Sequence, residues 1–127
     1  MLGKTCYIDF DGTIQENGYP EIGFLNEFCF DVLWQLHNLG FKLILNTYRA
    51  DLKNGSLEAA KDFIKINNLP ITTCNTIKIN PKIFNPIDKE IFIDDESDGC
   101  PLKLSDRIYN KKVVCWVTIQ EKIIEIL

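Results

Sequence analysis

Short apolar runs recur along the chain, and each is followed directly by polar or turn-forming residues. Runs of this length and composition are typical of strands that are buried on both faces of a parallel sheet. Residues 101–110 lack such a run and are expected to form loop with a short helix. We expect strands, in chain order, at residues 5–8, 41–45, 71–79, 91–93 and 113–117.

Apolar residues three and four positions apart fill several of the segments between these runs. This spacing predicts an amphipathic helix over residues 24–39, which Gly40 ends. A second helix is expected over residues 57–64 with Ser56 as its N-cap, and a brief terminal helix over residues 121–127. Strands and helices therefore alternate along the chain.

The alternation predicts an α/β fold, a Rossmann-like three-layer sandwich in which helices cover both faces of a mostly parallel central sheet. No repeat, low-complexity tract or linker divides residues 1–127, so we expect one domain. Residues 14–23 contain Asn17-Gly18 and Pro20, which are strong turn signals. We expect a small hairpin or flap there.

The composition narrows the class of protein. The net charge of −4 over 127 residues argues against a nucleic-acid binder that relies on a broad basic surface. Its five cysteines form no CxxC pair, which argues against a zinc site of the usual spacing. Neither a signal peptide nor an apolar stretch long enough to cross a bilayer is visible, so we expect a cytoplasmic protein without a membrane partner.

Three of the predicted strands end in polar clusters. In an open parallel sheet the carboxyl ends of the strands meet at one edge, where ligands bind. Up to four carboxylates would repel one another at this edge, and a divalent cation would relieve that repulsion. Oxygen ligands without soft donors favour Mg²⁺. The clusters are Asp9 with Asp11, Thr47 with Arg49, and Asp94 with Asp95.

Two aspartates separated by one residue suit phosphoryl transfer. Asp9 can attack phosphorus to form an acyl phosphate, while Asp11 protonates the leaving oxygen and later takes a proton from water. Gly12 allows the turn that brings both carboxylates to one opening. Thr47 can donate to one phosphate oxygen, and Lys82 can neutralise another.

The order of these residues resembles that of the haloacid dehalogenase-like (HAD) superfamily. The motif Asp9-Phe10-Asp11-Gly12-Thr13 follows a strand near the N-terminus, and Thr47, a lysine and Asp94-Asp95 follow in that order. The resemblance covers residues 7–102. It implies an Mg²⁺-dependent phosphatase with Asp9 as nucleophile and Asp11 as general acid/base. It also implies that Asp9, the backbone carbonyl of Asp11 and Asp94 hold the metal, and that Asp95 assists directly or through water.

The resemblance requires one lysine before the strand at residues 91–93, and the chain offers several. Lys82 is preferred, because residues 80–83 look like a short helix or turn that leads to this strand. Lys89 is too close to the strand and is expected at its opposite end. Lys78 remains an alternative.

The chain resembles the small capless members, because neither residues 14–23 nor the stretch from Arg49 to Lys82 has room for a cap domain. Without a cap, specificity is expected to come from the flap around Tyr19, from a partner subunit or from the substrate itself. The expected substrate is a small phosphorylated molecule, with phosphorylated nucleic acid or protein as alternatives. We assign four residues to substrate binding: Gly12, Thr13, Tyr19 and Arg49.

Two other functions fit part of the pattern. One is a catalytically silent HAD-like protein that binds or regulates, although the intact aspartates argue against it. The other is a signalling receiver domain that accepts a phosphoryl group on aspartate. In receivers the acidic pair follows the first strand, whereas Asp94-Asp95 comes late in this chain.

Overall fold

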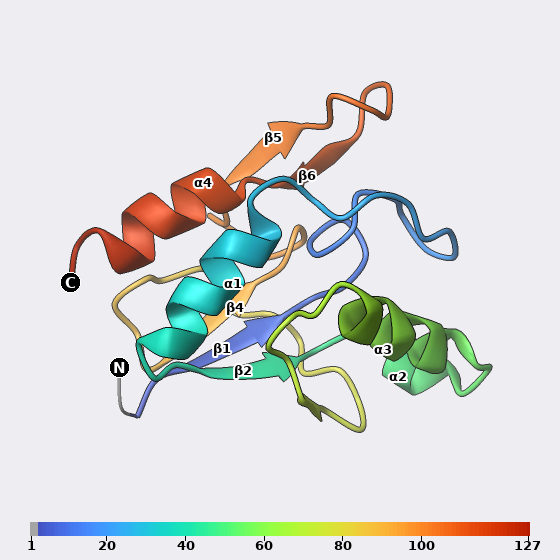
Figure 1. Ribbon diagram of the computed structural model, residues 1–127, viewed down its shortest axis with the longest axis horizontal. Helices are drawn as coiled ribbons and strands as arrows, with labels where there is room; N and C mark the ends of the chain where they lie inside the picture. Colours follow the sequence, from blue (N-terminus) through green and yellow to red (C-terminus); the bar gives the residue numbers. More distant parts are fainter. Residues whose placement is uncertain (1–2) are drawn as a thin grey trace.

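The computed structural model describes residues 3–127. A four-stranded parallel sheet forms its centre, with the strand order β3-β2-β1-β4 (Figure 1). Ile8 of β1 pairs with Leu45 of β2 and with Ile93 of β4, so these three strands end at the same edge. The strands are β1 (Thr5–Ile8), β2 (Lys42–Leu45), β3 (Thr73–Cys74) and β4 (Glu90–Ile93).

One face of the sheet packs against helices. The side chains of Cys6 and Ile8 are fully buried in a core that also holds Leu36, Ile64 and Trp116 from three different helices. These contacts anchor the helices because each one turns its apolar stripe toward the sheet. The helical segments are α1 (Cys29–Asn38), α2 (Arg49–Leu52), α3 (Ser56–Ile66), α4 (Trp116–Ile119) and the π-helical turn η1 (Gln120–Ile124).

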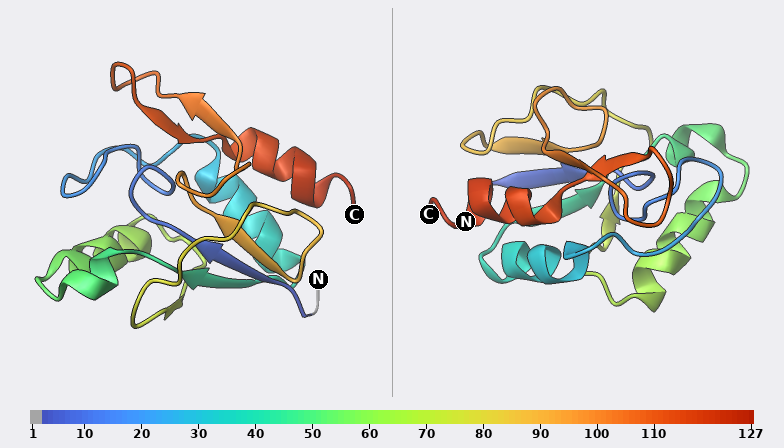
Figure 2. Two further views of the ribbon diagram at one scale, coloured as in Figure 1. Left: turned by 180° about the vertical axis from the view of Figure 1, so that it is seen from behind. Right: turned by 90° about the horizontal axis from the view of Figure 1, so that it is seen from above.

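The opposite face is covered by an irregular segment instead of a helix. Residues 75–89 connect β3 to β4 without a helix and cross this face, as the view from behind shows (Figure 2). Pro81 and Pro86 interrupt the segment, and proline removes the backbone donors that a helix needs. The α/β class and the parallel sheet are confirmed. The prediction of helices on both faces is wrong for the described residues.

Several predicted boundaries also change. The helix predicted over residues 24–39 begins only at Cys29, because Leu25 forms a bridge with Gln15. The strand predicted over residues 71–79 is reduced to the two residues of β3. Ser56 is the first residue of α3 and not its N-cap, and Asn54 Oδ1 accepts the hydrogen bond from its backbone N–H at 3.1 Å.

The C-terminal region differs most from the prediction. Residues 101–110 were expected to form loop and helix, but β5 (Leu102–Leu104) pairs antiparallel with β6 (Lys112–Val114). The apolar run over residues 113–117 is divided, because α4 begins at Trp116. No helix among residues 3–127 is long and apolar enough to cross a membrane.

Candidate functional site

Three carboxylates meet where β1 and β4 end. Asp9 follows β1, and Asp94 and Asp95 follow β4, so the pairing of these strands brings them together. One carboxylate oxygen of each lies within 4.8 Å of the others. Asp9 is 6% exposed and Asp94 is 1% exposed. A cluster of this kind offers oxygen ligands to a hard divalent cation.

The carboxylates disfavour one another's charge. Burial and the nearby charge of Asp94 raise the pKa of Asp9 well above its usual value. Burial chiefly raises the pKa of Asp95 to about 6. Asp94 Oδ2 is buried and has no hydrogen-bond partner of good geometry, although the Lys78 ammonium lies 3.0 Å from it. This edge of the sheet is short of positive charge.

Lys78 is the lysine that joins the cluster. Its Nζ lies 3.5 Å from Asp9 Oδ1 as well as beside Asp94, and its side chain is only 11% exposed. Two polar side chains fix its segment: Asp51 Oδ1 accepts from the Lys78 backbone N–H at 2.9 Å, and Asn46 Oδ1 accepts from the Ile79 N–H at 2.8 Å.

Lys82, which the sequence favoured, lies elsewhere. Its ammonium pairs with Glu90 at 3.4 Å, and its side chain is 67% exposed. Glu90 is opposite Thr5 at the amino end of the sheet, away from the carboxylates. The placement of Lys82 at this site is therefore wrong. The reason is the extended path of residues 75–89, which leaves the ammonium at the far end of the strand.

Asp11 and Arg49 form a buried pair beside the cluster. Arg49 donates from Nε and Nη2 to the two oxygens of Asp11 at 2.9 and 2.7 Å. The Arg49 side chain is 2% exposed, and its guanidinium lies between the rings of Phe10 and Tyr19. Arg49, predicted to bind substrate, is thus occupied by the protein's own groups. The Asp11 carboxylate does not belong to the three-aspartate cluster.

The flap over residues 14–23 is organised by Gln15, which the sequence analysis missed. Its buried amide Nε2 donates to Asp11 Oδ1 at 2.9 Å and to Asn17 O at 2.9 Å. Its Oε1 accepts from the backbone of Asn17 and Gly23. In the sequence, the one indication of this role is that a polar residue comes shortly after the motif Asp9-Phe10-Asp11-Gly12-Thr13. Tyr19 is 44% exposed, and its hydroxyl accepts from Asn54 Nδ2 at 3.0 Å.

Of the three remaining predicted residues, Gly12 and Thr13 contact Asp95, and Thr47 follows the neighbouring strand β2. Gly12 has φ +72°, and a Cβ there would lie 2.6 Å from Asp95 Oδ2. Thr13 is buried, and its hydroxyl accepts from the Asp95 backbone N–H at 3.3 Å. Thr47 is also buried, and its Oγ1 accepts from the Arg49 N–H at 3.2 Å, which leaves its own hydroxyl proton to donate.

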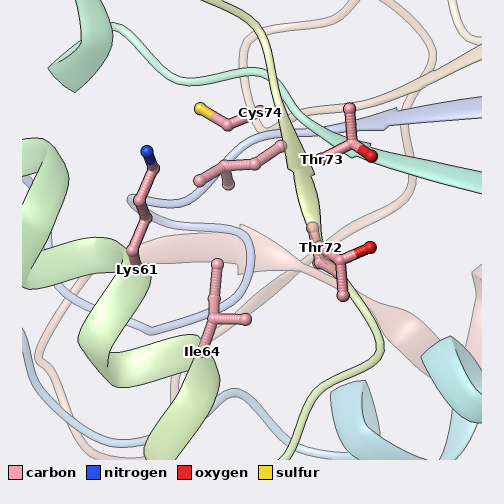
Figure 3. Close-up of a pocket in the computed structure, with 7 residues that line it drawn as sticks. Lys61, Ile64, Thr72, Thr73 and Cys74 are labelled. Atoms are coloured by element: carbon pink, nitrogen blue, oxygen red, sulfur yellow. The ribbon is translucent and has the colours of Figure 1, made fainter.

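A cavity of about 300 Å³ lies at the edge of the sheet between α3 and β3 (Figure 3). Lys61 and Cys74 extend from opposite walls, and none of the residues lining the cavity belongs to the carboxylate cluster. Burial raises the pKa of the Cys74 thiol despite the nearby Lys61. The thiol is therefore protonated and poorly reactive.

Comparisons of the chain with protein-family models, with curated proteins and with solved structures gave no match. The proposed function therefore rests on the geometry of the site.

Proposed function

We propose that this protein is an Mg²⁺-dependent phosphomonoesterase of the HAD-like type that works through a phosphorylated Asp9. The observation that carries the proposal is the convergence of Asp9, Asp94 and Asp95 with Lys78 at one edge of a parallel sheet. Thr47, which follows the neighbouring strand β2, completes the set. The five residues come from four separate segments of the chain, so the grouping is not a product of local sequence.

The donor set fits Mg²⁺. Asp9, Asp94 and Asp95 supply carboxylate oxygens, and the buried Asp94 Oδ2 lacks a well-aligned partner. Burial chiefly raises the pKa values of Asp9 and Asp95, and the charge of Asp94 adds to the rise, so a bound cation would stabilise their ionised forms. When bound, the metal would screen the carboxylates from the phosphate dianion and orient the phosphoryl group. The carbonyl of Asp11 is a fourth proposed ligand.

The chain's own residues can account for both steps. An Asp9 oxygen attacks phosphorus, the bond from phosphorus to the ester oxygen breaks, and Asp11 gives its proton to the leaving oxygen. Water then attacks the phosphoryl group and passes a proton to Asp11, and phosphate leaves Asp9. Lys78 and the Thr47 hydroxyl bind phosphoryl oxygens throughout.

Asp11 must change partners to do this. Its two oxygens are held by Arg49 and Gln15. While the Asp11 side chain is held in this way, it cannot act as a general acid toward a leaving group. It must first turn away from Arg49 and carry a proton. Rotation about its side-chain bonds toward Asp9 is therefore part of the proposed cycle.

The test is phosphate release from p-nitrophenyl phosphate and a panel of phosphomonoesters, with Mg²⁺ and with EDTA. Asp9→Asn should lower turnover by a factor on the order of 10⁴ or more, because the amide is a poor nucleophile of the same shape. Asp98→Asn is the matched control, since Asp98 is an exposed aspartate in the turn after β4. Equal activity in the Asp9→Asn and wild-type proteins would refute the proposal.

The two lysines provide a second comparison. Lys78→Ala should reduce turnover strongly, whereas Lys82→Ala should leave it near the wild-type value. The opposite order would refute the assignment of Lys78.

A further inference from the structure

The β5–β6 hairpin and the flap extend to the same side of the molecule as the carboxyl ends of β1 and β2 (Figure 1). Glu16 in the flap is buried and accepts hydrogen bonds from Ser105 and Arg107 in the hairpin's connecting loop. The two segments are therefore joined beside the carboxylate site. Residues 102–112 carry four cations and one carboxylate, although the chain as a whole has a net charge of −4.

Three of the hairpin's four cations either contact other groups of the protein or are exposed to solvent. Lys103 pairs with Glu27 at 2.6 Å, and Arg107 stacks over the Phe24 ring besides its bond to the flap. Lys112 is exposed. Lys111 differs from all three, because it is partly buried and its ammonium forms no ion pair with any carboxylate in residues 3–127.

The backbone holds Lys111 in place. Its carbonyl accepts from the Ser105 N–H at 2.8 Å. Its Nζ lies against the flap, 3.5 Å from the position that a Cβ on Gly18 would take. The residue before Gly18, Asn17, accepts from the Gly12 N–H at 3.1 Å, and Gly12 touches the carboxylate cluster. The unpaired ammonium therefore stands at the rim of the proposed active site.

The Lys111 ammonium remains available to a ligand. It lies beyond the 4.0 Å ion-pair distance from Asp95 and from every other carboxylate of residues 3–127. A cation that is partly removed from water and left without a partner has a strong preference for an anion.

We propose that Lys111 binds a second anionic group of the substrate, and that the substrates are small phosphomonoesters that carry a further carboxylate or phosphate. The inference rests on the proposed function, because it takes the phosphoryl group to lie at Asp9 and Lys78. Lys78 and the metal would balance the negative charge of the transferring phosphoryl group. Lys111 lies apart from Lys78, against Gly18 of the flap. The flap and hairpin thereby provide the selection that a cap domain would give.

The test measures binding, so it does not depend on turnover. Isothermal titration of the Mg²⁺-loaded protein would compare 2-phosphonoacetate, 3-phosphonopropionate and 4-phosphonobutyrate with the alkylphosphonates of the same chain length. Their carbon–phosphorus bonds resist hydrolysis, and within each pair only the carboxylate differs. We expect at least one phosphonocarboxylate to bind about tenfold more tightly than the alkylphosphonate of the same chain length, as a charged hydrogen bond would give.

Lys111→Ala should remove this advantage, Lys111→Arg should retain most of it, and Lys112→Ala should leave it unchanged. An advantage that persists in Lys111→Ala, or that is absent from the wild type, would overturn the inference. Equal weakening of both ligands would also overturn it, since Lys111 would then contact the phosphoryl group itself. Failure of the proposed function would show separately, as absent phosphate release from every ester.

Discussion

We expect the three-aspartate cluster to destabilise the folded protein when no metal is bound. Burial raises the pKa of Asp95 from 3.8 to about 6, so the folded state holds this proton more tightly than the unfolded chain does. Stability linked to such a proton is fully present below the unfolded pKa and is lost as the pH rises through the folded pKa. Replacing Asp95 by asparagine should therefore stabilise the metal-free protein, and it should do so most at neutral or higher pH.

The magnitude follows from the two pKa values. A rise from 3.8 to about 6, at about 1.4 kcal/mol per pH unit, costs about 3 kcal/mol at pH values above both. At about pH 4 the unfolded group also holds much of its proton, and the cost falls to about 0.5 kcal/mol. For a chain of this size about 4 °C accompanies each kcal/mol. We expect Asp95→Asn to raise Tm by about 10 °C at about pH 7.5 and by about 2 °C at about pH 4.

The assay is thermal unfolding followed by circular dichroism in EDTA at both pH values, repeated with excess Mg²⁺ at the higher one. Asp98→Asn removes the same charge from an exposed position nearby and should change Tm little. Mg²⁺ at about 100 times its Kd should stabilise the wild type by about 2.7 kcal/mol, and Asp95→Asn should lose most of this gain. The reasoning is refuted if Asp95→Asn lowers Tm in EDTA at about pH 7.5, or if Asp98→Asn raises it equally.

Three further substitutions test how the site is built. Gly12→Ala should destabilise the protein by about 1–3 kcal/mol in urea unfolding and weaken Mg²⁺ binding, because its φ is +72° and the new Cβ would press on Asp95. Asn46→Ala should lower turnover at nearly unchanged secondary structure by circular dichroism, because Lys78 would lose the anchor of its segment; wild-type kinetics would refute this role. Arg49→Ala should cost about 3–5 kcal/mol in urea unfolding, since it strands a partly buried carboxylate, and a loss under 1 kcal/mol would contradict that account.

The central strands were predictable because their signal is local. β1, β2 and β4 are short apolar runs that end at polar residues, and such runs are typical of strands in a parallel sheet that is buried on both faces. The hairpin of β5 and β6 was missed for the opposite reason. Residues 102–104 carry only two apolar side chains, both exposed, and the long connection lacks a two-residue turn signal.

The residues of the candidate site also differ in how well their positions could be predicted from the sequence. Asp9, Asp94 and Asp95 were placed together correctly, since each follows directly from a predicted strand. The position of Lys78 depends instead on hydrogen bonds from Asn46 and Asp51 to a segment without regular structure. Sequence spacing carries no information about such long-range bonds.

Arg49 shows the limit of assigning a role by residue type. A cation near a predicted phosphate site suggests anion binding, but only the fold shows which anion it meets. The guanidinium also donates to the carbonyls of Pro20 and Ser56, so it fastens the flap and α3 to Asp11. Five donors arranged in a rigid fork allow one side chain to hold all three.

Arg49 therefore couples the flap to Asp11, the proposed acid/base. If Asp11 turns toward Asp9, Arg49 loses its only carboxylate partner among the described residues while it stays 2% exposed. A buried guanidinium without an anion is costly, so the turn is favourable only when another group compensates the charge of Arg49, such as flap carbonyls that move closer. We therefore expect the flap to move together with Asp11 in the proposed cycle, because one guanidinium group holds both through its hydrogen bonds.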